Sequence, residues 1–253
     1  MMKKSLLYYL MLLILGLVSG RGDANAQDSL NKVRAFLEKT QTAYRAAGQL
    51  AFHVKYIYAN AGQADRHLDS LSGEVEIDKG RSRFVIDGTE TLVTSKYAIH
   101  VVTEDKLIYL SKPTGSGMMD PAGLVDSMLA HMEGMQTRLE TQRGAETLTI
   151  RFPPGKGYTM VRMTMNSRTG LLERVVCDLK TAAVVGEEMV EQPGHPGPYQ
   201  PEGRVEIYFS GYTKGGFGEE LFNEEKFFTR VGDRFIPAER YKDYHIFLAS
   251  SHL

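Results

Sequence analysis

From residue 50 onward, apolar and polar residues alternate along the chain with a period of two. The alternation is clearest in LAFHVKYIY, residues 50–58, where every second side chain is large and apolar. Side chains at that spacing lie on one face of a β-strand, and turns such as Asp87-Gly88 separate the runs. The pattern predicts an antiparallel meander with strands at 50–58, 71–78, 82–87, 90–94, 98–103 and 106–110.

The same alternation returns in the second half of the chain. Runs at 147–152, 158–166, 171–179 and 205–212 predict further strands, and 226–228 and 235–236 are candidate edge strands. Residues 193–203, PGHPGPYQPEG, hold four of the nine prolines and predict an ordered loop without regular structure. The sum is one β-domain of roughly ten strands.

Two segments follow helical spacing instead. In 28–47, apolar side chains recur three and four residues apart and Gly48 supplies a stop, which predicts an amphipathic helix. In GMMDPAGLVDSMLAHMEGM, residues 117–135, Asp120 is a good N-cap and Pro121 suits the first turn. The apolar stripe of this second helix holds Leu124, Val125, Met128, Leu129, Met132, Met135 and Leu139.

The first residues have the layout of a secretory signal peptide. Lys3 and Lys4 precede the apolar run 6–18, and Ala24-Asn25-Ala26 fits the small-residue cleavage pattern. We expect a signal peptide over 1–26, cleaved before Gln27. The apolar run is shorter than the roughly 20 residues of a membrane span, although an uncleaved anchor is the alternative.

Charge and cysteine content narrow the class of protein. The formal net charge is −1, and removal of 1–26 makes it more negative, so nothing indicates the basic face of a nucleic-acid-binding protein. The single cysteine, Cys177, cannot form an internal disulfide. Residues 27–253 are therefore expected to form a single domain with an ordinary hydrophobic core.

Common catalytic and metal-binding motifs are missing. The sequence has no G-x-x-x-x-G-K-[ST] loop, no G-x-S-x-G elbow and no H-E-x-x-H helix. Ser116, flanked by glycines, is interpreted as a hinge, and Cys177 as a buried, inert thiol. The histidines lack metal-ligand spacing. We expect no catalytic residue, metal or cofactor, with a hydrolase of dispersed catalytic residues as an alternative.

Methionine gathers in the second helix, where five of the twelve lie within 118–135. Methionine adapts its shape to irregular apolar partners, and Gly115, Gly117 and Gly134 flank the segment. A methionine stripe is ordinary core in most helices. Between glycine joints it predicts a lid over an apolar cavity, where each buried methylene contributes about 0.8 kcal/mol.

Several phrases of the sequence resemble the periplasmic outer-membrane lipoprotein carriers of the LolA type. They are LAFHVKYIYA, LSGEVEIDKGRSRFVIDG, TLVTSKYAIHVVTEDKLIYLSKP, MTMNSRTGLLERVVCDL and VEIYFSGYT, and they span most of 28–213. The resemblance implies a mainly β (α+β) fold, a strongly curved, half-open antiparallel β-barrel with a helical lid. It does not extend to 214–253. The basic residue that latches the lid has three candidates, Lys79, Arg81 and Arg83.

The resemblance also implies a function and a location. The expected protein is a periplasmic, monomeric carrier that shelters lipid or lipoprotein acyl chains for transfer towards the outer membrane, with inner- and outer-membrane envelope proteins as partners. A non-catalytic sensor or docking module on the same fold is the alternative. Combined with strand parity, this predicts the ligand-binding residues Phe84, Ile86, Ile99, Val101, Leu107 and Tyr109 of the sheet, and Met118, Met119, Leu124, Met128 and Met132 of the lid.

Overall fold

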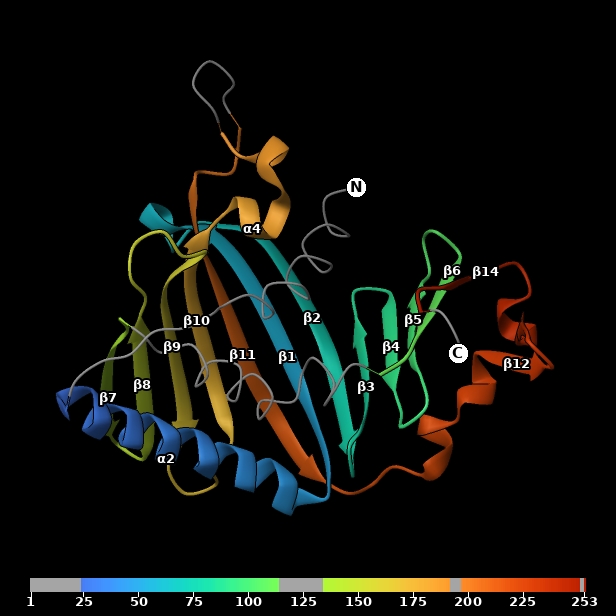
Figure 1. Cartoon of the computed structure of the whole chain (residues 1–253), viewed down its shortest axis with the longest axis horizontal. Helices are drawn as coiled ribbons and strands as arrows, with labels where there is room; N and C mark the ends of the chain where they lie inside the picture. The colour runs from blue at the N-terminus through green and yellow to red at the C-terminus, as the bar shows by residue number, and fades with distance from the viewer. Residues whose placement is uncertain (1–23, 114–133, 192–196, 251–252) are drawn as a thin grey trace. The chain divides into compact units, whose positions relative to one another are not determined.

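The computed structural model describes residues 24–113, 134–191, 197–250 and 253 (Figure 1). Its main sheet has twelve strands in the order β14-β6-β5-β4-β3-β2-β1-β11-β10-β9-β8-β7, and β12 pairs with β13 in a second sheet. Pairings from β2 to β6 and from β7 to β11 are antiparallel, whereas β14 joins β6 in parallel. The predicted fold class, mainly β with helices and one antiparallel sheet that does not close, is confirmed.

The elements have these bounds. The strands are β1 Gln49–Asn60, β2 His67–Asp78, β3 Arg81–Ile86, β4 Thr89–Val93, β5 Ala98–Val102, β6 Leu107–Ser111, β7 Gln136–Gln142, β8 Ala145–Arg151, β9 Tyr158–Asn166, β10 Leu172–Lys180, β11 Glu202–Lys214, β12 Phe228–Val231, β13 Arg234–Pro237 and β14 His245–Leu248. The helices are α2 Ala24–Ala47 and α4 Ala182–Val185, and short 3₁₀ turns are η1 Ala61–Gln63, η2 Glu187–Met189, η3 Glu219–Phe222, η4 Glu224–Lys226 and η5 Glu239–Tyr241.

The chain divides into two compact units that interleave along the sequence. Unit 1 comprises Met1–Ala46, Lys55–Ser70 and Asp120–Phe209, and unit 2 comprises Ala47–Val54, Leu71–Met119 and Ser210–Leu253. Strands β1, β2 and β11 therefore contribute residues to both units. The single domain expected over 27–253 stays a prediction.

In unit 1, helix α2 packs on strands β8 and β9 through its apolar stripe. Phe36 and Leu37 are buried. The Thr40 hydroxyl lies 3.2 Å from Met165 Sδ, and Lys39 pairs with Glu146 at the rim. The helix predicted at 28–47 is confirmed and begins earlier, at Ala24. No helix of the described residues has the length and hydropathy to cross a membrane.

Two-residue turns fix the hairpins of unit 2. Lys79-Gly80, between β2 and β3, has φ values of 47° and 87°. Asp87-Gly88, between β3 and β4, has 45° and 77°. Left-handed backbone at both turn positions is the type I′ geometry, whose twist matches that of the flanking strands. These turns, visible in the sequence, align the strands in register.

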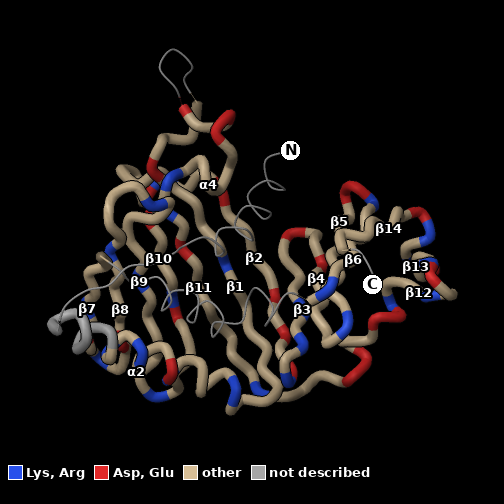
Figure 2. The backbone as a smooth tube through the Cα atoms, viewed as in Figure 1, with Lys and Arg blue, Asp and Glu red and all other residues tan. Residues whose placement is uncertain are grey.

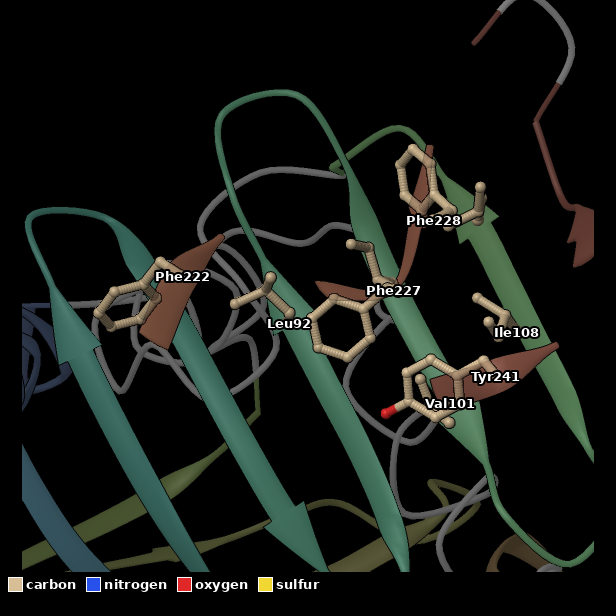
Figure 3. Close-up of a cluster of buried hydrophobic side chains, with 9 residues drawn as sticks. Leu92, Val101, Ile108, Phe222, Phe227, Phe228 and Tyr241 are labelled. Atoms are coloured by element: carbon tan, nitrogen blue, oxygen red, sulfur yellow. The ribbon is translucent and has the colours of Figure 1, made fainter. Parts of the chain in front are cut away.

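The C-terminal segment, residues 215–253, forms the second side of the unit 2 core. This core consists of nine buried side chains. Five come from the sheet, Leu92 of β4 and four residues of β5 and β6, and four are the rings of Phe222, Phe227, Phe228 and Tyr241. Figure 3 shows the Phe227 and Tyr241 rings beside Leu92 and Val101. The segment then ends in β14, which extends the main sheet beyond β6.

Three sequence predictions need correction or stand outside the description. Residues 136–142 form strand β7, so Leu139 belongs to a strand and the predicted helical stripe is wrong there. The predicted edge strand at 235–236 is confirmed within β13, Arg234–Pro237, whereas the one at 226–228 shares only Phe228 with β12, Phe228–Val231; the two strands pair with each other in a separate hairpin. Most of the predicted lid helix, 117–133, lies outside the described residues, and its last two residues, Gly134 and Met135, are not helical.

Candidate functional site

The first face of the unit 2 sheet is defined by a row of side chains across six strands. Residues directly opposite each other on neighbouring strands point to the same face. The registers join Val75 to Phe84, Phe84 to Thr91, Thr91 to His100, His100 to Tyr109 and Tyr109 to Phe247. We call this side the Phe84 face. Two neighbouring rows lie on the same face. One consists of Ile86, Thr89, Val102 and Leu107, and the other of Ser82, Val93, Ala98 and Ser111.

The second face of the same strands is named the Val101 face. Its registers join Leu92 to Ile99, Ile99 to Leu110 and Val101 to Ile108. These five side chains are at most 1% exposed and form one cluster with the aromatic rings of the C-terminal segment. The apolar partner of the Val101 face is therefore a part of the chain itself.

The six ligand-binding residues predicted on the sheet do not all lie on the same face. Phe84, Ile86, Leu107 and Tyr109 lie on the Phe84 face, and we keep them as candidates. Ile99 and Val101 lie on the opposite face, beneath the C-terminal segment.

The expectation that all six share one surface is wrong, because Ile99 and Val101 face the other way. The lid residues Met118, Met119, Leu124, Met128 and Met132 lie outside the described residues.

The Phe84 face is mostly apolar; it has a hydrogen-bonded polar pair near its middle, and Ser82, Thr89 and Ser111 in the neighbouring rows. Phe84 is 5% and Ile86 6% exposed. The Tyr109 and Phe247 rings meet edge-on, with centroids 5.6 Å apart. Between these aromatic groups, Thr91 Oγ1 and His100 Nδ1 are 2.9 Å apart, and burial lowers the pKa of His100. Mostly apolar surface with few placed polar groups is typical of small-ligand sites.

Ion pairs hold the C-terminal segment against β3 and β4. Arg81 pairs with Asp78 and, through Nη1 at 2.5 Å, with Glu219 of η3. These contacts, led by the hydrogen bond to Glu219, raise the pKa of the Arg81 guanidinium. Arg81 also lies over the Phe222 ring, 4.7 Å from its centroid. Arg81 of β3 is thus joined to the C-terminal segment both by an ion pair and by contact with an aromatic ring.

Arg83 forms the second ionic group of the Val101 face. Its Nε lies 2.7 Å from Glu90, its Nη1 lies 3.2 Å from Glu76, and Arg240 approaches Glu90 at 3.7 Å. Burial raises the pKa of Glu76, and the Arg83 charge opposes this shift.

Two of the three candidate latch residues, Arg81 and Arg83, therefore pair with carboxylates on the Val101 face. The third candidate, Lys79, lies in the β2–β3 turn.

Unit 1 has an apolar and a charged face of its own. Cys177 lies opposite Val161 and Val205, on the side of the sheet where Met163 and Met165 lie. On the other side, Arg174 pairs with Glu206 at 2.6 Å, and the Arg204 side chain pairs with Asp178 through two hydrogen bonds of 2.6 and 2.9 Å. The charged positions along β10 and β11 can be followed in Figure 2. Helix α2 packs on the apolar side, through Met165.

Among the described residues, the Cys177 thiol is not an activated nucleophile and no cluster of metal ligands is present. Burial raises the pKa of the Cys177 thiol to about 12, which keeps it protonated and unreactive near neutral pH. Within the described ranges, no three His, Cys, Asp or Glu side chains come together as metal ligands. Ser116 lies outside them. What the described surfaces offer a ligand is apolar area and a few hydrogen bonds.

Comparison with known proteins gives similarity of fold at low sequence identity. No family model matches the sequence, and no curated protein matches it. Among solved structures, an uncharacterized conserved protein from Thermus thermophilus is 9% identical with a TM-score of 0.48, covering 86% of this chain and 99% of its own.

Two further structures have the same kind of similarity. A LolA superfamily protein from Nitrosomonas europaea is 12% identical with a TM-score of 0.36, covering 76% of this chain and 98% of its own. The MucA/MucB complex of Pseudomonas aeruginosa is 12% identical with a TM-score of 0.41, covering 76% of this chain and 60% of the matched chain. The solved structures that the chain is similar to thus include a LolA superfamily protein, at low sequence identity.

Proposed function

We propose that the chain is an exported carrier that shelters lipid or lipoprotein acyl chains on an apolar sheet surface, for transfer towards the outer membrane. It performs no covalent chemistry. The observation that carries the proposal is the Phe84 face, whose rows of apolar side chains run across the strands of unit 2. An acyl chain that lies along such a row gains about 0.8 kcal/mol per buried methylene, so no reactive group is needed for useful affinity.

The arrangement of the C-terminal segment adds to this support. Most sheets of small domains bury one apolar face against the rest of the chain. Here strands β4 to β6 bury the Val101 face against residues 215–253, yet the Phe84 face of the same strands is also apolar. We propose that an acyl chain packs on this second apolar face when the protein carries its ligand.

The proposal includes a route and an oligomeric state. The signal peptide is removed before Gln27, and the mature chain works in the periplasm as a monomer that meets membrane proteins at each end of its path. Mass determination of the purified protein from cell envelopes tests the cleavage. A mass that includes residues 1–26 would contradict it.

Ligand recovery is the decisive experiment for carriage. We expect native mass spectrometry of protein purified without detergent to find bound lipid, and a fluorescent fatty acid to bind the delipidated protein with saturation. The variant Leu107→Glu places a charge on the Phe84 face and should abolish probe binding. Val231→Glu makes the same kind of change at a side chain that is 60% exposed on β12 and should leave binding intact.

Two results would contradict carriage. One is the absence of both co-purified lipid and probe binding in the wild-type protein. The other is equal probe binding by Leu107→Glu and the wild-type protein, since the proposed surface would then not be where the chain binds.

A second candidate function, a non-catalytic docking or sensor module, is favoured by the edge of the sheet. Strand β14 ends the strand order, and its Phe247 and Leu248 are 56% and 46% exposed. An extended segment of an envelope protein could add to such an edge through main-chain hydrogen bonds. This candidate predicts a stable complex in pull-downs from envelope extracts that Phe247→Asp removes, together with no lipid in the purified protein.

A further inference from the structure

The polar pair on the Phe84 face, Thr91 and His100, lies between the aromatic side chains of Phe84 and Tyr109. Thr91 and His100 are opposite each other on β4 and β5, in the row that runs from Val75 through Phe84 to Tyr109. The next side chains on the same face of β5, Ala98 and Val102, carry no polar side-chain atom. Buried polar groups carry a desolvation cost unless they are hydrogen-bonded. The hydrogen bond between Thr91 and His100 offsets this cost for the two atoms that it joins.

The tautomer of the imidazole is linked to the direction of the hydrogen bond between the two side chains. Thr91 is 3% exposed, and its hydroxyl proton needs an acceptor in that buried position. The hydrogen bond of this hydroxyl is to His100 Nδ1, at 2.9 Å. When the hydroxyl donates to Nδ1, a neutral imidazole carries its own proton on Nε2.

The charge state agrees with this assignment. Burial lowers the pKa of His100, so the ring is neutral at neutral pH. None of its neighbours on the face, Thr91, Tyr109, Ala98 and Val102, is an Asp, Glu, Lys or Arg. With Nδ1 paired to Thr91, the ring then has one N–H, on Nε2, to offer to an acceptor on the Phe84 face.

We propose that His100, oriented by Thr91, is the hydrogen-bond donor that receives the carbonyl oxygen of an acyl ligand on the Phe84 face. The inference rests on the proposed function and deepens it, because it names the ligand class: chains that end in a carboxyl or ester group, in preference to plain hydrocarbon. The aromatic side chains of the row, Phe84 and Tyr109, pack along the hydrocarbon. A bound acceptor completes the hydrogen bonding of the imidazole.

Three probes of similar chain length separate the carbonyl from the hydrocarbon. Dodecanoic acid, methyl dodecanoate and tridecane compete with the apolar fluorophore N-phenyl-1-naphthylamine for delipidated protein. In His100→Phe, which keeps the volume but removes the donor, we expect dodecanoic acid and its ester to bind about tenfold more weakly, as the loss of one hydrogen bond of this kind predicts. The affinity for tridecane should stay within about twofold.

Two further variants guard against a merely structural effect. His100→Gln keeps an N–H donor in a similar place and should restore most of the affinity for the acid and the ester. Thr91→Val leaves the imidazole in place but frees its tautomer, which predicts a weaker loss of about two- to threefold. A variant is used only if its melting temperature lies within a few degrees of the wild-type value. If His100→Phe does not meet this condition, the affinities of Thr91→Val for the three probes test the proposal in its place.

A spectroscopic measurement reports on the donor directly. In ¹⁵N NMR of imidazole-labelled protein, His100 should show the Nε2–H tautomer, and dodecanoic acid should shift the Nε2 resonance while tridecane does not. A loss of affinity for the acid alone, with the ester unchanged, narrows the ligand to carboxylates and still supports the donor role.

The proposal is overturned by equal losses for all three probes, by no loss for any of them, or by an Nδ1–H tautomer. A wild-type protein that binds none of the probes refutes carriage itself. A wild-type protein that binds them all with the same affinity in every variant refutes only the role of His100.

Discussion

The guanidinium of Arg81 lies over the ring of Phe222, with its carbon 4.7 Å from the ring centroid. The contact joins β3 to the turn η3, at the start of the C-terminal segment. A guanidinium over an aromatic face gains electrostatic attraction, and Asp78 and Glu219 hold Arg81 in this place. The aromatic cluster that follows along the chain completes the core of unit 2.

Truncation of the cluster at its centre should weaken unit 2 strongly. Phe227 is 1% exposed among Leu92, Val101 and Tyr241, and we expect Phe227→Ala to lower the free energy of unfolding by about 3–5 kcal/mol. Urea unfolding followed by tyrosine fluorescence measures the change. The control is Val231→Ala on the exposed side of the hairpin, where about 0.5 kcal/mol or less is expected. Equal effects of the two changes would contradict the cluster.

The close approach of β2 and β3 at Gly73 leaves no room for a methyl group. A Cβ there would lie 2.3 Å from the Val85 carbonyl oxygen and 2.5 Å from Ile86 Cγ1. Gly73→Ala should therefore cost about 1–3 kcal/mol, as overpacking does. Gly157→Ala is the matched control, since a Cβ at Gly157 meets nothing within 4 Å. Thermal melts of both variants measure the difference, and a neutral Gly73→Ala would refute the close contact.

The thiol of Cys177 should react slowly in the folded protein. Burial raises its pKa to about 12, so at pH 8 the reactive thiolate is about three orders of magnitude scarcer than for an ordinary cysteine. Ellman's reagent should modify the native protein over hours and the urea-unfolded protein within seconds to minutes. Fast modification of the native protein would show that the thiol is accessible and ionised.

His100 should make stability depend on pH in a defined direction. Its pKa is lowered in the folded protein, whereas the unfolded chain protonates near pH 6.5. Between these values the unfolded state binds the additional proton, so the free energy of unfolding falls as the pH drops from 7.5 to 5.5.

The matched comparison is His100→Gln, which lacks the titrating group. Urea unfolding at both pH values should give a smaller fall for the variant than for the wild-type protein, because all other titrations are shared. Identical falls would mean that His100 titrates alike in the folded and unfolded states.

The sequence was a good guide where local chemistry decides the structure. The dipeptides Lys79-Gly80 and Asp87-Gly88 can adopt the left-handed turn, and alternation marked the strands beside them. Strand β7 was not predicted, because its sequence QTRLETQ does not alternate between apolar and polar residues. The positions of β7 and β14 depend on the strands with which they pair.

The candidate site was harder to predict than the strands. In AIHVV, residues 98–102, both faces are largely apolar, so parity could not tell which face Ile99 and Val101 occupy. The answer depends on 215–253, whose aromatic residues pack on one of the two faces only in three dimensions. The same ambiguity hid His100, which looked like an isolated histidine until the register set it beside Thr91.

The pairing of β14 with β6 joins residues 245–248 to 107–110. Contacts between such distant positions form late, because a long loop must close before they can form. Leu92, Ile99 and Ile108 then lack their aromatic neighbours until residues 222–241 have left the ribosome. A nascent chain stalled before that point would expose an apolar strand surface, and transiently exposed surface of this kind is prone to aggregation.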